Sequence, residues 1–385
     1  MSFRDYPWRY ALFFMAYYAA NSVFQGYMSL YYAARGLDAA RIGAIFSAIA
    51  LVSAAAQPCW GLCADRARSR NRVLHLLAAG SCAAALSFLL ADRFLPLLLL
   101  GCLFSCFYTS IQPMGDSIAL TALNEQNQPF GPVRLAGGVT FALASLAFGA
   151  LIDVPGRESL AVWCTAALCL TVIPASYALP DTPGYQSREN RRMSIAALLK
   201  DRELMRLMLF MLPMQMTMGY FYTFFSPMFL TFDGANGTLL GWCYFIATIG
   251  EIPYLLLSDR LYDRFGAGRL MCAAGAALAL RWLLLALTRN VAVIMASQLL
   301  HGWGFIVMTV AMAKHISRTV PAELQATGQM LLAVVSYGFA RAIGNLGGGL
   351  LAGALGQQNV FYLTSGICLL SLVLFAPSFF RRRRA

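Results

Sequence analysis

Two carboxylates and four basic side chains fall inside long apolar stretches of this sequence. The acids are Asp116 and Glu251, and the basic residues are Arg134, Arg281, Arg341 and His301. An isolated charge in hydrocarbon costs at least about 2.5 to 3.5 kcal/mol, so such residues are candidates for function by default. A carboxyl group in a dehydrated cavity can load and release a proton near neutral pH.

The spacing of these charges predicts two clusters. Asp116 ends one apolar run and Arg134 begins the next, so on antiparallel helices they lie at similar depth and can pair. A carboxylate beside a guanidinium offers acceptors and a rigid donor fork, which suits a polyhydroxylated ligand or a carboxylate ligand. Glu251, Arg281 and His301 fall in three consecutive runs further along and form a candidate proton site.

The elements that must position these groups are membrane helices. Only 12% of the 385 residues are charged, whereas a soluble domain carries roughly 25%. Apolar runs of about 20 residues are what a helix needs to cross a bilayer. The sequence predicts an all-α membrane protein with twelve such runs, at 8–33, 41–63, 73–91, 94–120, 133–153, 159–178, 204–232, 239–258, 270–288, 291–313, 326–352 and 358–378.

A polar stretch divides the twelve predicted spans into six and six. We interpret 1–179 as an N-terminal six-helix bundle, 180–203 as a cytoplasmic linker and 204–385 as a C-terminal six-helix bundle. Lysine and arginine accumulate on one side of this topology, which holds 21 of the 29 such residues. The positive-inside rule then places both termini in the cytoplasm. Topology thus explains the net charge of +12, and nucleic-acid binding is not needed to account for it.

The two halves resemble each other at the loop after their second predicted span. The first copy holds Gly61, Asp65 and Arg66, and the second holds Asp263, Arg264 and Gly266. These residues resemble the Gly-x3-Asp-Arg-x-Gly signature of the major facilitator superfamily. The resemblance implies alternating access by two pseudo-symmetric bundles, with the Asp and Arg pinning helix ends and gating the switch. Such repeats place substrate at their interface near the midplane.

Within that superfamily the chain resembles the lactose-permease side, which includes the oligosaccharide and phenylpropionate proton symporters. The resemblance is carried by FGPVR ending at Arg134, TIGE ending at Glu251, Arg281-Trp282 and LLH ending at His301. It implies proton symport with Asp116 and Arg134 at the ligand. Glu251, Arg281 and His301 would couple the proton, and Arg341 falls where that group has a buried lysine.

The sequence also departs from that group. Span seven has no acidic residue to neutralise Arg341, and Gly304 replaces the acid expected three residues after His301. Phe141 stands where the group has a sugar-stacking indole. Substrate contacts are therefore expected from Asp116, Arg134, Phe141, Glu251, His301 and Arg341, together with Asn21 and Gln25 among the aromatic residues of span one.

Glycines concentrate in spans five and eleven, which we expect to form the contact between the halves. The favoured function is import of a sugar, oligosaccharide or glycoside with protons, across a bacterial inner membrane, by a monomer. A carrier of an aromatic carboxylate or nucleoside stays open as an alternative, followed by a drug exporter and a non-transporting receptor. No partnered nucleophile, metal-ligand spacing or phosphate loop points to an enzyme or a cofactor.

Overall fold

The computed structural model describes residues 7–154, 156–183 and 195–380, and within these ranges the side chains of 195–197, 322, 323 and 326 are not described. All regular secondary structure in the described ranges is helical, so the expected all-α fold is confirmed. The helices before the linker are α1 (Trp8–Ala34), α2 (Ala39–Arg66), α3 (Arg70–Ser87) with the 3-10 turn η1 (Phe88–Leu90), α4 (Phe94–Tyr108), α5 (Ile111–Glu125), α6 (Gly131–Leu151) and α7 (Leu160–Tyr177).

A short helix, α8 (Ile195–Lys200), lies in the predicted linker. It is followed by α9 (Arg202–Phe229), α10 (Gly237–Ile249), α11 (Ile252–Leu287), α12 (Val291–Ser297), α13 (Leu299–His301), α14 (Val307–Thr319), α15 (Ala322–Leu332), α16 (Arg341–Leu355) and α17 (Val360–Phe380). Two π-helical segments interrupt this series, η2 (Gly302–Ile306) and η3 (Ala333–Ala340).

Several membrane crossings are built from more than one helix. α4 and α5 form one crossing, α12 to α14 with η2 form another, and α15, η3 and α16 a third. α11 is the reverse case, because Gly266 has φ 72° and ψ 167° and turns its 36 residues into two helices. Only glycine adopts this backbone conformation without strain, so the motif glycine is the turn between predicted spans eight and nine. Counted this way, the described residues contain the twelve expected crossings.

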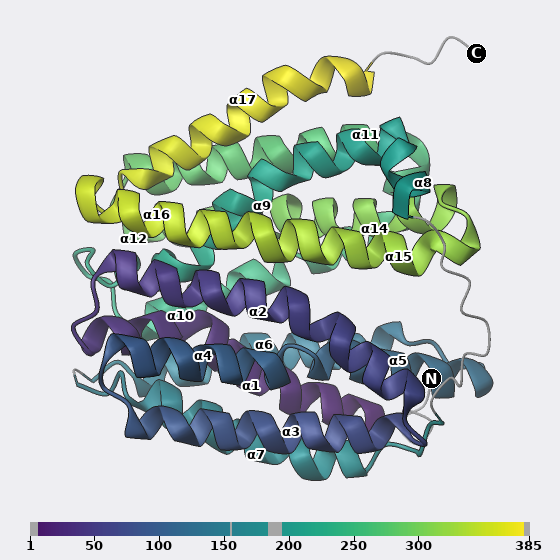
Figure 1. The fold of residues 1–385 in the computed structure, drawn as a ribbon. Helices are drawn as coiled ribbons and strands as arrows, with labels where there is room; N and C mark the ends of the chain where they lie inside the picture. The colour runs from purple at the N-terminus through teal and green to yellow at the C-terminus, as the bar shows by residue number, and fades with distance from the viewer. Residues whose placement is uncertain (1–6, 155, 184–194, 381–385) are drawn as a thin grey trace.

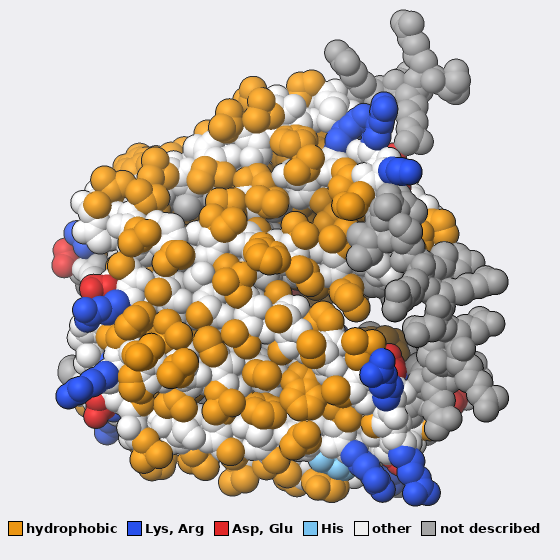
Figure 2. All heavy atoms as spheres, viewed as in Figure 1, with side chains coloured by type: hydrophobic (Ala, Val, Ile, Leu, Met, Phe, Trp, Pro, Cys, Tyr) orange, Lys and Arg blue, Asp and Glu red, His pale blue; other side chains and the backbone are white. Residues whose placement is uncertain are grey.

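The flank of the bundle is apolar. Figure 2 shows hydrophobic side chains over the middle of the visible face, with lysine, arginine and acidic groups gathered at its two ends. Among the described residues, nine continuous helical stretches meet length and hydropathy criteria for crossing a membrane, and one of these, residues 237–287, contains two crossings. The surface is therefore that of an integral multi-pass membrane protein.

Helices of one half pack against helices of the other. α6 packs mainly on α10, and α2 packs mainly on α16 (Figure 1). A Cβ added to Gly149 would lie 2.9 Å from Gly241 Cα, and one added to Gly349 would lie 3.1 Å from Gly43 Cα, so the backbones touch at both crossings. The glycine-rich spans five and eleven therefore do form contacts between the halves, each with its own partner helix.

Hydrogen bonds also hold the two halves together where α6 ends and α10 begins. Asp153, just after α6, accepts hydrogen bonds from the backbone N–H of Gly237 at 2.9 Å and from the hydroxyl of Thr238 at 2.7 Å. Ser226 on α9 donates to the carbonyl of Gly26 on α1 at 2.5 Å. The two halves are thus closed against each other on the side of the bundle where α10 begins.

Candidate functional site

Asp116 and Arg134 form the ion pair that their spacing predicts. Arg134 Nη1 donates to Asp116 Oδ1 at 2.7 Å, between α5 and α6. The guanidinium lies 5.0 Å from the ring centre of Tyr18 on α1, a cation–π contact. Both side chains keep solvent exposure, 26% for Asp116 and 33% for Arg134, although they lie within apolar helices. An ion pair with open edges can hydrogen-bond a solute and still satisfy its own charges.

The helix carrying Asp116 is interrupted one and a half turns earlier. α4 ends at Tyr108 and α5 begins at Ile111, with Pro113 in the first turn of α5. Proline is tolerated at a helix start because it has no N–H to donate there. The break lets the second segment set its own direction and carries Asp116 toward α6.

Glu251 occupies a second break, between α10 and α11. It is the residue directly before α11, whose first turn contains Pro253. Its Oε1 lies 3.8 Å from His301 Nε2, and its side chain is 22% exposed. The two segments approach closely because Gly302 packs on the break: a Cβ there would lie 2.3 Å from the carbonyl oxygen of Gly250. Glycine at position 302 is therefore needed to bring the acid beside the histidine.

Arg281 fixes the protonation pattern of His301. It is fully buried, and its Nη1 lies 2.9 Å from His301 Nδ1. A guanidinium can only donate, so Nδ1 must be the acceptor and the neutral ring carries its proton on Nε2. That proton points to the side where Glu251 and the hydroxyl of Tyr222 lie, the latter at 3.3 Å. The arrangement presents a donor to a carboxylate and is consistent with the predicted proton site.

Gln298 completes this cluster and was not singled out by the sequence. Its side-chain oxygen accepts a hydrogen bond from Arg281, and the glutamine is 1% exposed. The guanidinium also stacks 4.0 Å above the ring centre of Phe221. A buried cation thus has an amide, an imidazole and an aromatic face as neighbours, and its charge is not cancelled by an adjacent carboxylate in the described contacts.

Arg341 has an amide partner where the resemblance leads one to expect an acid. Its Nε donates to Gln215 Oε1 on α9 at 3.1 Å. Its guanidinium also lies 5.0 Å from the Tyr337 ring centre and 5.1 Å from that of Tyr222. Span seven contains no acid to neutralise Arg341, and Gln215 is its partner in the structure. Gln215 was not among the predicted site residues, although a lone glutamine in an apolar run was a usable signal.

The two π-helical segments flank these basic groups. η2 begins directly after His301, and η3 ends directly before Arg341. A π-helical turn widens the helix and leaves part of the backbone ladder irregular, and such turns are frequent at functional sites. They rotate the following side chains relative to an ideal helix, which a periodicity argument does not capture.

A tyrosine on the first helix of each half lies near these charged groups. Tyr18 on α1 lies within electrostatic reach of Asp116, Arg134 and Glu251. Tyr222 on α9 is a neighbour of Glu251, Arg281 and Arg341. Of these two tyrosines, only Tyr18 has charged groups of both halves within electrostatic reach, because the groups around Tyr222 all belong to the C-terminal half.

Asn21, Gln25 and Phe141 are the remaining residues that were predicted to contact the solute. Asn21 and Gln25 are partly buried on α1 and bond each other at 3.3 Å, from Asn21 Nδ2 to Gln25 Oε1. Phe141 is partly buried on α6, two turns after Arg134. The geometry is compatible with a solute contact at these positions, which stays a prediction.

In the first copy of the loop motif, the arginine that pairs is not the one the motif indicates. Arg70 Nη2 lies 3.2 Å from Asp65 Oδ1, and Arg70 Nη1 donates to Ser117 on α5 at 2.8 Å. Arg70 is 4% exposed, whereas Arg66 is exposed at the end of α2. Gly61 lies within α2 and has open space beside it. The expected tie between helix ends exists, but Arg70 makes it.

The second copy forms a fuller network. Asp263 pairs with Arg318 of α14, and Asp259 accepts from Lys314 Nζ at 2.5 Å. The hydrogen bond from Lys314 lowers the pKa of Asp259, which lies in the connection between spans eight and nine. Arg264 stacks over Phe265 at 5.3 Å instead of joining these pairs. As in the first copy, the acids of the motif hold a basic residue on a neighbouring helix.

Comparison with known proteins agrees with this fold. The model of the MFS_1-like family matches residues 7–363. The chain belongs to this family of the major facilitator superfamily. The protein is therefore a membrane transporter of small molecules and not an enzyme.

Individual relatives cover nearly the whole transporter. The maltose permease of Geobacillus stearothermophilus is 30% identical over 385 residues, covering 97% of this chain and 94% of that protein. The probable 3-phenylpropionic acid transporter of Escherichia coli K12 is 23% identical, covering 94% and 96%. A mutant of the nucleoside transporter NupG has the same fold, with a TM-score of 0.87 at 16% identity and 97% and 99% of the two chains covered.

Proposed function

We propose that this transporter is a proton-coupled importer of a small organic solute, with a sugar, oligosaccharide or glycoside as the favoured substrate. The observation that carries the proposal is the pair of charge clusters, one in each half, whose acids lie in or just after the helix breaks between α4 and α5 and between α10 and α11. One offers a carboxylate and a guanidinium for hydroxyl groups, and the other offers a carboxylate beside an imidazole donor.

In this proposal Asp116 and Arg134 bind the solute. Sugar hydroxyls are both donors and acceptors, and the ion pair supplies the complementary groups at 2.7 Å spacing with open edges. Aromatic rings next to the pair, such as Tyr18, can cover the apolar face of a sugar ring. The 30% identity to a maltose permease supports a sugar over other neutral solutes.

Glu251 is proposed to carry the proton. When protonated it is a neutral group that can cross the transport cycle without an uncompensated charge. When ionised it is stabilised by the Nε2 proton of His301, 3.8 Å away, whose orientation Arg281 sets. We propose that Tyr18 links proton loading to solute binding, since it contacts Arg134 and is within electrostatic reach of Glu251.

The motif residues are proposed to gate the switch at the cytoplasmic end. Asp65 with Arg70, and Asp263 with Arg318, join neighbouring helix ends within each half. The distribution of Lys and Arg supports cytoplasmic termini in a bacterial inner membrane. We propose that the protein works as a monomer, since each chain contains both clusters.

The experiment that tests this function separates coupling from exchange. Glu251→Gln should lose uphill accumulation while still exchanging external labelled maltose for internal unlabelled maltose, because exchange needs no net proton movement. Glu125→Gln is the matched control, since Glu125 is exposed at the end of α5. Uphill accumulation that survives in Glu251→Gln would contradict the role of this residue.

Arg341 supports a second candidate, a carrier of an aromatic carboxylate. Its guanidinium has aromatic faces and an amide around it but pairs with no acid in the described contacts, so it could receive an anion. The relative named as a 3-phenylpropionic acid transporter is consistent with such a substrate. Inhibition of maltose exchange by phenylpropionate, lost in Arg341→Gln, would favour this reading.

A further inference from the structure

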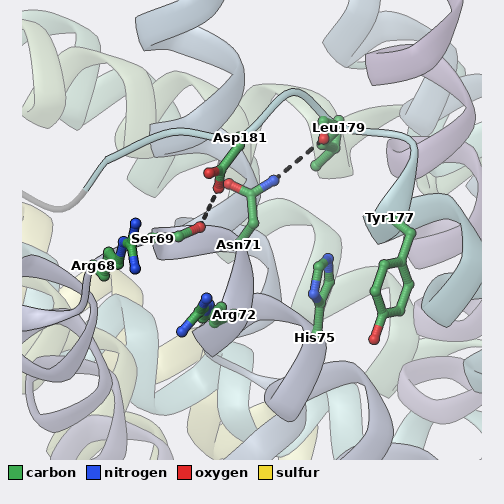
Figure 3. A pocket seen from close by; sticks show the side chains of 8 residues that line it. All are labelled: Arg68, Ser69, Asn71, Arg72, His75, Tyr177, Leu179 and Asp181. Carbon is green, nitrogen blue, oxygen red and sulfur yellow. Dashed lines mark hydrogen bonds between the residues drawn. The ribbon is translucent and has the colours of Figure 1, made fainter.

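A cavity lies outside the transport site, at the end of the bundle where α3 begins and α7 ends. Its volume is about 490 Å³, and it is lined by the loop before α3, the first two turns of α3 and the chain that follows α7. Figure 3 shows Asp181 facing Ser69, Asn71 reaching to Leu179, and His75 beside Tyr177. α3 and α7 pack on each other at the lower edge of the bundle in Figure 1.

Hydrogen bonds hold the floor of the cavity together. Asn71 Nδ2 donates to the carbonyl oxygens of Leu179 at 3.3 Å and Pro180 at 3.0 Å, while its Oδ1 accepts from Thr182 N at 3.1 Å. Ser69 donates to the carboxylate of Asp181. The side chains of Ser69 and Asn71 are buried. These hydrogen bonds hold the start of the linker against α3. They also pair the polar groups of Ser69, Asn71 and Asp181 with partners inside the protein.

The described walls carry a net positive charge. Arg68 and Arg72 are exposed and line the cavity, and neither takes part in any ion pair among the described residues. Among the described residues that line the cavity, Asp181 supplies the single carboxylate, so the two arginines still leave an excess of positive charge. Moreover, the first turn of α3 contains arginines and no acid, the reverse of what the helix dipole favours. An anion in the cavity would remove this unfavourable arrangement.

The surroundings are those of a membrane interface. Leu76 follows Arg72 by one turn of α3, and its side chain is exposed. The rings of His75 and Tyr177 stack with centroids 3.7 Å apart, and Tyr177 is exposed. Amphipathic rings collect at the level of lipid headgroups, and basic pockets between helix ends bind phosphorylated headgroups. The cavity therefore has arginines in its lining and lies beside exposed apolar side chains on the surface of the bundle.

We propose that this cavity binds the phosphate of an anionic phospholipid headgroup, with Arg68 and Arg72 as its cations and an acyl chain along the exposed face of α3. The site lies beside the bond between Asp65 and Arg70, because Arg70 stands between the two cationic residues in sequence. A lipid held there would steady the loop that carries the motif acid and the start of the linker.

The test measures lipid binding to the purified full chain in neutral detergent. The probes are short-chain phosphatidylglycerol, short-chain phosphatidylcholine and inorganic phosphate alone. Native mass spectrometry measures how much of each probe is bound. Arg68→Gln with Arg72→Gln should weaken phosphatidylglycerol binding about 30-fold, the equivalent of about 1 kcal/mol per cation. The matched control removes two exposed arginines at the same end of the other half, Arg206→Gln with Arg260→Gln, and should change binding less than about threefold.

Each outcome decides the proposal. Replacement of both cavity arginines by lysine keeps the charge and should retain binding within a few-fold, which guards against a misfolded glutamine variant. Equal loss in the two glutamine pairs, or no loss in either, would overturn the site in favour of general charge attraction. Inorganic phosphate binding as tightly as phosphatidylglycerol would overturn the lipid assignment and leave a free-phosphate site. Equal binding of phosphatidylcholine would overturn the requirement for an anion.

Discussion

A single methyl group at position 302 should uncouple the transporter. A Cβ in Gly302→Ala would lie 2.3 Å from Gly250 O and 2.7 Å from Glu251 N, where ordinary contacts begin at 3.4 Å. Both atoms belong to backbone, so no side chain can rotate away. The break between α10 and α11 must therefore move away from η2 by about 1 Å.

The size of the effect follows from this geometry. Forcing an extra methyl into a tight contact costs typically about 1 to 3 kcal/mol. At 3.8 Å Glu251 and His301 interact electrostatically and not through a hydrogen bond, and a further 1 Å weakens the interaction proposed to stabilise the ionised acid. We expect uphill accumulation to fall about tenfold or more, since each 1.4 kcal/mol is a factor of ten.

The assay compares accumulation and exchange of labelled maltose in vesicles. Gly302→Ala should lose accumulation more than exchange, because exchange does not require the proton to leave. Gly353→Ala is the control, since a Cβ on Gly353 meets no atom within 4 Å. If Gly302→Ala folds and accumulates solute like the wild type while keeping the same ratio of uptake to exchange, the reasoning about this contact is refuted.

Three further predictions concern other contacts. Arg70→Gln should slow transport at least about tenfold, because it removes charged hydrogen bonds worth about 1.5 to 3 kcal/mol to Asp65 and Ser117, whereas Arg66→Gln should stay within about threefold; equal effects on initial uptake rates would contradict the assignment. Arg341→Gln should reduce exchange of an aromatic acid about tenfold or more and of a neutral sugar less, and the reverse order in competition assays would exclude an anion site. Asp153→Asn should open the contact between the halves at the start of α10, seen as faster alkylation of a cysteine introduced at the partly buried Leu239, and an unchanged rate would count against this latch.

The sequence predicted most of the fold because the membrane imposes it. Each crossing must be a helix of about 20 apolar residues, so hydropathy alone placed the crossings near their observed limits. The charged pairs Asp116–Arg134 and Arg281–His301 could be predicted for a related reason. Intramembrane charges are few, and antiparallel helices bring those of similar depth together.

What the sequence did not predict depends on local backbone geometry and on uncharged partners. Asp65 pairs with Arg70 and not Arg66, because the chain turns before α3 and brings the first residue of that helix back to the acid. Gln215 and Gln298 bear no charge, so a search for ionisable residues passes over them. The π-helical segments η2 and η3 have no periodicity signature, yet η2 directly follows His301 and η3 leads directly into Arg341.

The most direct test of proton symport is the external pH of a lightly buffered suspension of energy-depleted cells that express the protein. Maltose, other oligosaccharides, glycosides, nucleosides and aromatic acids are added one at a time. Proton symport predicts transient alkalinisation with a sugar, as protons enter with the solute, and no alkalinisation in Glu251→Gln. Labelled uptake of a compound without any pH change in the wild type would contradict proton coupling and the role of Glu251.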